Sequence, residues 1–205
     1  VHLELSAHRA RVPAVSYVAG VRAFASVCAQ VNFEVVAPRA RVPAAKHAAG
    51  AVVAAVDAVM QGQATTSFCA VRPPGHHALP GQAMGFCFYN NIGVAAAHAM
   101  AVHGVKRLAI IDFDVHHGNG TEAMFANRPE VLMCSFFQHP LFPHSGTEHP
   151  ASNMVNVPVP AYTNGKVVRE IVSEQWLPRL EAHRPELILI SAGFDAHRED
   201  DIGQM

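Results

Sequence analysis

Short runs of hydrophobic residues alternate along the chain with longer segments of helix-forming residues. The runs at 107–113, 130–136 and 186–192 have the length of strands and almost no polar alternation, which predicts strands buried on both faces. A fourth short run, 67–71, ends at the breaker Pro73-Pro74-Gly75. Continuous apolar strands of this kind are typical of a mostly parallel sheet.

Helices are predicted between these strands, and several of their ends carry capping residues. Gly62 closes the first helix, and Asn90 or Asn91 can cap the second. Asn164 begins the last helix, which Pro178 kinks or divides. The predicted helices span 44–60, 91–103, 120–126 and 164–183. Strands alternating with helices predict an α/β domain, in which a functional site lies at the carboxyl ends of the strands.

Composition and charge exclude several classes of protein. The 205 residues are 50% hydrophobic with a net charge of −1, which fits one domain and disfavours both disorder and general nucleic-acid binding. The four cysteines form no C-x-x-C pair, so we expect reduced core thiols. No uninterrupted apolar run is long enough to span a membrane, and the first residues do not resemble a signal peptide. We therefore expect a cytoplasmic protein without membrane association, cut at both ends.

The chain has 14 histidines, which makes a metal site a candidate function. Asp112, Asp114 and His116 follow a predicted strand at alternate positions, which would turn them to one side. Carboxylate oxygen and imidazole nitrogen suit Zn²⁺ or another borderline divalent ion. Asp195, after a different strand, is the natural third ligand. Either of the first two aspartates alone would more readily be a turn cap, but the whole array favours a metal site.

A second cluster is the tandem pair His76 and His77, held on a stiff loop after the Pro-Pro-Gly breaker. Such a pair could supply a general base for a metal-activated water and a general acid for a leaving amine. Each imidazole needs an orienting partner, and Asp112 and Asn119 are the nearest polar candidates. We interpret the lone histidines as surface or satisfied core residues: His2, His8, His47, His98, His103 and His183.

An aromatic segment, 84–90, offers walls for a substrate channel. Gly85 would let a ligand approach the backbone, and Phe86 would supply one wall. Phe142, in a later loop, could form the opposite wall. A narrow aromatic slot of this kind suits a long aliphatic side chain, although packing in the core explains the other aromatic residues of the segment.

Four successive motifs carry a family resemblance, at 73–78, 85–91, 112–121 and 191–195. Their order and spacing resemble the histone deacetylase family, particularly its class II branch and the bacterial deacetylase-like amidohydrolases. The resemblance extends from about residue 44 to the end of the chain. It implies an arginase–deacetylase-like three-layer α/β fold, here incomplete. Residues 43–205 would be a partial catalytic domain, with 1–42 an unassigned N-terminal segment.

The resemblance also implies roles for individual residues. The implied zinc ligands are Asp114, His116 and Asp195. The implied catalytic residues are His77 as general base and acid, His76 as its partner bonded to Asp112, and Asn119 as the residue that orients His77. The implied substrate contacts are Gly85, Phe86 and Phe142. A structural monovalent cation, K⁺ in this family, would match Asp112, Asp114, His116, Ser135 and Phe136.

The resemblance implies hydrolysis of an N-acetyl amide, with an acetylated lysine of a histone or another protein as substrate. Acetylated polyamines or other acetylated small amines are the alternative substrates for the same machinery. A further alternative is an inactive fragment, because the family's oxyanion tyrosine belongs to a Gly-Gly-Tyr motif that would follow Met205. An arginase-like two-metal hydrolase would need further carboxylates, which the sequence does not place in a matching motif. The oligomeric state is left open.

Overall fold

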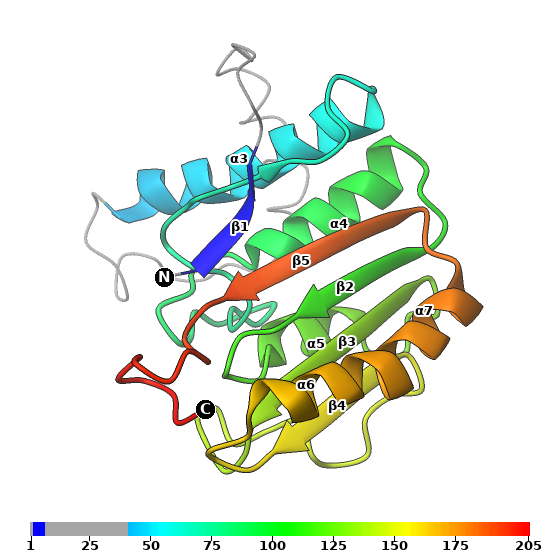
Figure 1. Cartoon of the computed structure of the whole chain (residues 1–205). Helices are drawn as coiled ribbons and strands as arrows, with labels where there is room; N and C mark the ends of the chain where they lie inside the picture. The colour runs from blue at the N-terminus through cyan, green and yellow to red at the C-terminus, as the bar shows by residue number, and fades with distance from the viewer. Residues whose placement is uncertain (1, 7–40) are drawn as a thin grey trace.

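The computed structural model describes residues 2–6 and 41–205 and forms one five-stranded sheet (Figure 1). The strand order across the sheet is β1-β5-β2-β3-β4. The four strands from β5 to β4 are parallel, and β1 joins the edge of β5 in the antiparallel direction. The strands are β1 (His2–Ser6), β2 (Leu108–Asp112), β3 (Val131–Gln138), β4 (Met154–Val159) and β5 (Leu187–Gly193).

Helices cover both faces of the sheet, giving three layers. In Figure 1, α3 and α4 lie with α5 on one side, and α6 and α7 lie on the other. The helices are α3 (Arg41–Met60), α4 (Asn91–Val102), α5 (Asn119–Phe125), α6 (Gly165–Ile171), the π-helical η1 (Val172–Trp176) and α7 (Leu177–His183). This is the α/β architecture that the alternation of strands and helices predicts.

The two cores follow from the side-chain alternation of the strands. In β3, Met133 packs in the core under α3, α4 and α5, whereas Leu132 and Cys134 pack in the core under α6 and η1. All eight residues of β3 are buried. A strand that buries both faces needs hydrophobic residues at nearly every position, which explains the continuous apolar run in the sequence.

Helix α3 is hydrophobic enough to raise the question of a membrane span. By length and composition alone, Val42–Met60 could cross a membrane, although Gly50 and Asp57 interrupt its apolar run. A buried core helix meets the same test, so one such helix is weak evidence for a span. In the structure Ala49 and Val52 are buried, and α3 packs against α4.

Two local features differ from the sequence prediction, and the division of the last helix close to Pro178 agrees with it. The segment 67–71 is not one of the described strands of the sheet, and only Phe68 within it has strand conformation. The edge strand β4 was not predicted, because Asn156 and Pro158 interrupt its apolar pattern. The last helix is divided by the π-helical turn η1, which ends two residues before Pro178, a residue without the N–H that a regular helix needs.

Candidate metal centre and paired histidines

The candidate site lies at the carboxyl edge of the parallel strands, and the strand register places its parts side by side. Asp112, the last residue of β2, is aligned with Ser135 of β3 and with Ser191 of β5. The loop after β2 therefore begins level with the end of β5. This common edge brings together Asp114 and Asp195, which are far apart in the sequence.

Asp114, His116 and Asp195 converge on one point. His116 Nδ1 lies 3.0 Å from Asp114 Oδ1 and 2.9 Å from Asp195 Oδ2, and one possible ligand atom from each residue falls within 4.8 Å of the others. Asp114 is fully buried, and only 12% of the His116 side chain is exposed. The three residues that the sequence pattern singled out as metal ligands are thus the three that the fold brings together.

The charge balance of this cluster fits a bound cation. Burial lowers the pKa of His116, but hydrogen bonds to Asp114 and Asp195 outweigh it and raise the pKa to about 9. The two buried carboxylates thus stabilise positive charge on the group between them. The same two carboxylates would stabilise a divalent cation, and two carboxylates with one imidazole form a donor set suited to Zn²⁺.

The backbone around the cluster is shaped to hold the carboxylates. The amide of Val115 donates to Asp195 Oδ1 at 3.0 Å, and that of His116 donates to Asp114 Oδ1 at 2.8 Å. Gly193 lies directly against Asp114, because a Cβ atom added to this glycine would be 2.2 Å from Asp114 Oδ2. A side chain at position 193 would occupy the space that the Asp114 carboxylate needs.

The tandem histidines each hold a separate polar partner. His76 Nδ1 lies 2.9 Å from Asp112 Oδ2, and both side chains are buried. His77 Nδ1 lies 2.8 Å from Asn119 Oδ1, at the start of α5. The two imidazole rings are 4.0 Å apart between centroids. Both partners are those that the sequence analysis named for this pair.

His77 is held in the neutral form. Burial and the neighbouring His76 lower the pKa of His77 to about 3, against smaller opposing contributions from Asn119 and Asp114. The imidazole is therefore unprotonated at neutral pH and can accept a proton. Its ring is 5.9 Å between centroids from that of His116, so an unprotonated imidazole lies beside the candidate metal ligands.

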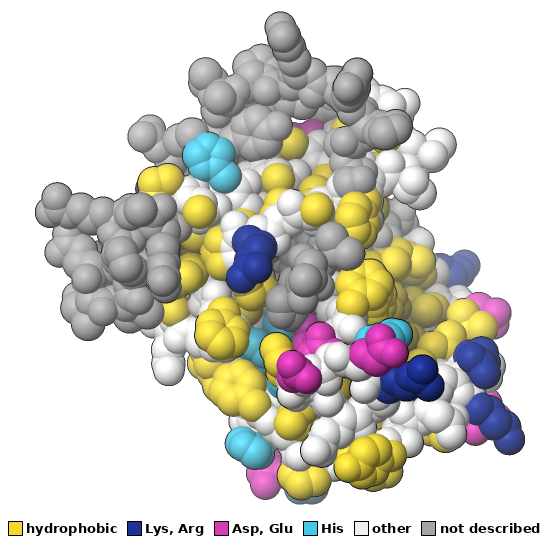
Figure 2. Space-filling model, turned by 60° about the vertical axis from the view of Figure 1, so that its left-hand side comes forward, with side chains coloured by type: hydrophobic (Ala, Val, Ile, Leu, Met, Phe, Trp, Pro, Cys, Tyr) yellow, Lys and Arg dark blue, Asp and Glu magenta, His cyan; other side chains and the backbone are white. Residues whose placement is uncertain are grey.

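Two of the predicted channel residues contact His77. The Phe142 ring meets the His77 ring edge-on, with centroids 5.1 Å apart. Gly85 has a φ of +54° and leaves no room for a side chain, because an added Cβ would be 2.3 Å from His77 Cδ2. Phe86 also has a positive φ and is 86% exposed. Hydrophobic side chains are spread over this end of the molecule, with histidine and acidic side chains among them (Figure 2).

The residues proposed for a monovalent cation are only partly gathered. Ser135 is buried and aligned with Asp112 across the sheet. The Phe136 side chain packs against Trp176 on the opposite face, so only its backbone is available on the side of the site. The cation site stays a prediction.

A buried network beside the site was not found by sequence reasoning. His117 Nε2 lies 2.7 Å from Glu122 Oε2, and His117 Nδ1 lies 2.9 Å from Ser145 Oγ. Asn156 of β4 donates to Glu122 Oε2 at 2.9 Å. These bonds tie the loop that carries Phe142 to α5 and β4. The only sequence signal for the network is that His117 directly follows His116.

The fold and site together define a class of protein: a three-layer α/β domain with a buried Asp-His-Asp cluster and a histidine pair at the carboxyl edge of a parallel sheet. The family model described as the histone deacetylase domain matches residues 7–205. The chain belongs to the histone deacetylase family.

Known proteins similar to this chain carry related names. It is 44% identical over 160 residues to the histone deacetylase-like amidohydrolase of Pseudomonas aeruginosa. This alignment covers 75% of this chain and 42% of that protein. It is 39% identical over 163 residues to a probable deacetylase of Methanothermobacter thermautotrophicus, covering 76% and 48%. A crystal structure of the HDA15 HD domain aligns with a TM-score of 0.72 at 38% identity, covering 78% of this chain and 49% of that one. The chain therefore spans about half the length of these proteins, and the structural likeness confirms the predicted arginase–deacetylase-like fold.

Proposed function

We propose that this chain carries the catalytic machinery of a zinc-dependent deacetylase that hydrolyses the N-acetyl amide of acetylated lysine. The family is that of deacetylases and related amidohydrolases. The observation that carries the proposal is the convergence of Asp114, His116 and Asp195 on one point beside the His76–His77 pair. The machinery lies within 43–205, the partial catalytic domain proposed from the sequence.

Each residue of the site has a separate role in the proposed amide hydrolysis. Asp114, His116 and Asp195 would hold Zn²⁺, which when bound supplies Lewis acidity and lowers the pKa of a coordinated water. His77, whose imidazole is neutral, takes a proton from the attacking water and returns it to the leaving amine. Asn119 fixes the orientation of His77 through the bond at Nδ1.

His76 has a different task in this proposal. Its bond to Asp112 places a buried carboxylate behind the imidazole. The carboxylate fixes the orientation of His76 beside His77, with the two ring centroids 4.0 Å apart. His76 would thus act as the electrostatic partner of His77 during hydrolysis.

The substrate class follows from the surroundings of His77. Phe142 lies edge-on to its ring, and Gly85 brings the backbone against it. These groups form an apolar approach that fits the methylene chain of an acetylated lysine. An acetylated small amine with an aliphatic chain would fit the same approach and is the second candidate. A monovalent cation near Asp112 and Ser135 belongs to the same proposal, as a structural ion.

The test measures zinc content and turnover together. The chain, purified without a histidine tag and supplied with Zn²⁺, is assayed on an acetyl-lysine peptide and on an acetylated polyamine. His77→Ala should lower kcat by about 10²–10⁴-fold while zinc stays bound, and Asp114→Ala should lose the zinc. His47→Gln, which changes an exposed histidine on α3, is the matched control.

The outcomes separate the alternatives. Preference for the peptide supports the protein deacetylase, and preference for the polyamine supports the small-amine hydrolase. Tight zinc that depends on Asp114 without turnover of either substrate would mean that this chain holds the metal but is not a complete enzyme. Turnover that survives in His77→Ala would remove His77 from its assigned role.

A further inference from the structure

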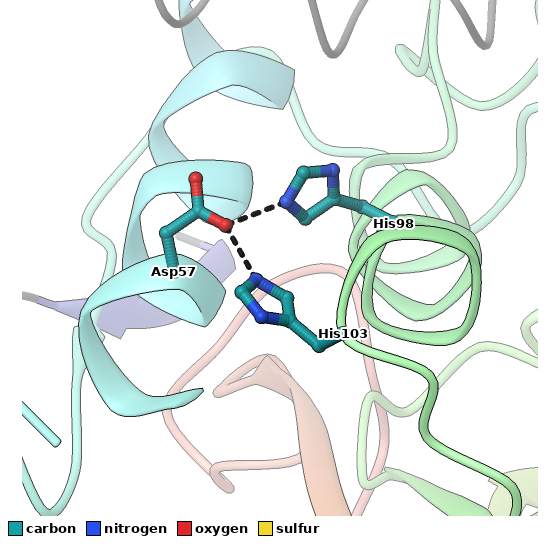
Figure 3. Close-up of side chains that lie close together, drawn as sticks. All are labelled: Asp57, His98 and His103. Atoms are coloured by element: carbon teal, nitrogen blue, oxygen red, sulfur yellow. Dashed lines mark hydrogen bonds and ion pairs between the residues drawn. The ribbon is translucent and has the colours of Figure 1, made fainter. Parts of the chain in front are cut away.

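A second group of possible metal ligands lies between helices α3 and α4. Asp57 belongs to α3, His98 belongs to α4, and His103 is the residue that caps the end of α4. Figure 3 shows both imidazole rings directed at the same carboxylate oxygen. Asp57 Oδ1 lies 2.7 Å from His98 Nε2 and 2.7 Å from His103 Nε2. One possible ligand atom from each residue falls within 4.8 Å of the others.

This group is separate from the centre at the carboxyl edge of the sheet. Helix α4 begins at Asn91, beside the loops of the histidine pair, and runs back before the chain enters β2 at Leu108. His98 is therefore in its second half and His103 directly follows its last residue, toward the end of the sheet where the parallel strands begin. None of the three residues belongs to a motif that carries the family resemblance.

The packing of α3 on α4 preorganises the three side chains. Val52, Ala55 and Val56 of α3 are buried in the same core cluster as Ala95 and Ala99 of α4. The small side chains of α4 allow the two helices to approach closely. The backbones that carry Asp57 and the two histidines are thus fixed by hydrophobic contacts that do not depend on a ligand.

The chemistry of the group suits a borderline divalent cation. Two imidazole nitrogens and one carboxylate oxygen are ligands that Zn²⁺ accepts, with water completing a tetrahedral set. The side chains are 11%, 14% and 30% exposed for His98, His103 and Asp57. This partial exposure leaves an entry path for the ion and room for water. With neutral histidines the group carries one negative charge, which attracts a cation.

We propose that Asp57, His98 and His103 form a second zinc site, which braces α3 against α4. The ion would replace the two hydrogen bonds at Asp57 Oδ1 with bonds to a common centre. Because zinc would bind the folded arrangement and not the separated helices, it would stabilise the folded protein by mass action. The role assigned to this site is structural, since it lies away from the catalytic histidines.

The experiment counts zinc in the tag-free chain after dialysis and measures its melting temperature with and without Zn²⁺. Asp57→Asn is the main variant, because the amide oxygen still accepts the two hydrogen bonds but lacks the charge that zinc requires. His103→Gln is a second, independent variant that retains a donor. His47→Gln controls for loss of an exposed histidine on the same helix. Circular dichroism confirms that each variant is folded.

The expected result is two zinc ions in the unsubstituted chain and one in Asp57→Asn, with a smaller zinc-dependent rise in melting temperature in that variant. Asp114→Ala should also hold one, so the two sites are counted independently. A single zinc that Asp57→Asn retains and Asp114→Ala loses would overturn the second site and leave the trio as a hydrogen-bonded cluster. A single zinc with the opposite pattern would support the second site and contradict the proposed catalytic centre.

Discussion

His77 donates the hydrogen on Nδ1 to Asn119 Oδ1 across 2.8 Å. The amide nitrogen of Asn119 faces Met84 Sδ at 3.4 Å, which turns its oxygen toward the histidine. An amide oxygen can only accept a hydrogen bond, so the proton of neutral His77 sits on Nδ1 and Nε2 is the basic nitrogen. The bond thus selects the tautomer as well as the ring orientation.

Replacing Asn119 with alanine should impair turnover without preventing substrate binding. The ring of His77 would lose the acceptor that fixes its tautomer, and we expect kcat to fall by about 10- to 100-fold with KM nearly unchanged. Asn119→Asp keeps an acceptor at Nδ1 and should recover part of the rate. The measurement is steady-state kinetics of the zinc-loaded chain on an acetyl-lysine peptide. A rise in KM at constant kcat would contradict the positioning role.

Gly193→Ala should weaken the metal centre from the backbone side. The new Cβ would meet Asp114 Oδ2 at 2.2 Å, so the carboxylate must move away from His116. We expect zinc affinity to fall by about 10- to 100-fold and stability to fall by about 1–3 kcal/mol. Titration with a competing chelator and urea unfolding measure the two effects.

Gly165→Ala is the matched control for that substitution. An added Cβ at Gly165 meets nothing closer than the Arg169 side chain at 3.4 Å, in the first turn of α6. Both the stability and the zinc affinity of this variant should match the unsubstituted chain. Equal zinc affinities for Gly193→Ala and Gly165→Ala would show that Asp114 is not a ligand, or that it moves without cost.

The Glu122–His117 pair predicts a pH dependence of stability. The hydrogen bond from His117 holds the pKa of Glu122 below its usual value of 4.5, with Asn156 adding to the effect and burial opposing it. A carboxyl whose pKa is lower in the folded state stabilises the protein above the unfolded pKa. That contribution is lost as the pH falls through the folded pKa.

Glu122→Gln removes this titration while leaving an amide that can still accept hydrogen bonds. In urea unfolding, the variant should be less stable than the unsubstituted chain at neutral pH. The difference should shrink as the pH falls below about 4.5 and through the folded pKa of Glu122. A difference that stays constant over the acid range would show that the charge on Glu122 contributes nothing to folding.

The Asn153 side chain links the end of α5 to the start of β3 by hydrogen bonds, and this structural role can be tested by measuring stability alone. Its Nδ2 lies 2.8 Å from the carbonyl oxygens of both Phe125 and Val131, and its Oδ1 accepts from the amide of Asn127 at 3.1 Å. Asn153→Ala would leave buried backbone groups without these partners. We expect a loss of about 1–3 kcal/mol in the free energy of unfolding. Ser173→Ala, on an exposed part of η1, should change it little.

The parts of the fold that sequence predicted are those where local pattern and tertiary environment agree. The strands β2 and β3 are buried on both faces, so their apolar runs are unambiguous. Strand β5 was also predicted to be buried on both faces, but it exposes Ile188 and Ile190 and buries its other side chains better. Strand β4 lies at the sheet edge, where Asn156 and Pro158 are tolerated and the pattern is lost. Strand β1 pairs with β5 across almost the whole length of the chain, which no local window can reveal.

The candidate site was likewise predictable only where its signals are local in the sequence. The Asp-x-Asp-x-His spacing and the tandem histidines are local signals, and the rule that strand ends meet at one edge brings in Asp195. The trio at Asp57 was not predicted, because His98 and His103 are 41 and 46 residues away from it. Taken singly, each histidine is more simply interpreted as a surface or core residue. Only the packing of α3 on α4 brings the three side chains together.

Because Asp112 is aligned with Ser191, metal binding at Asp114 and Asp195 depends on the correct register between β2 and β5. A slip of one residue between β2 and β5 would carry Asp195 about 3.3 Å along the strand and turn neighbouring side chains to the opposite face. Chains with that error would retain their helices and much of their hydrophobic burial, yet would lack the proposed ligand set. Retention of the zinc that depends on Asp114 would then distinguish correctly paired chains from mispaired ones that spectroscopy of secondary structure counts as folded.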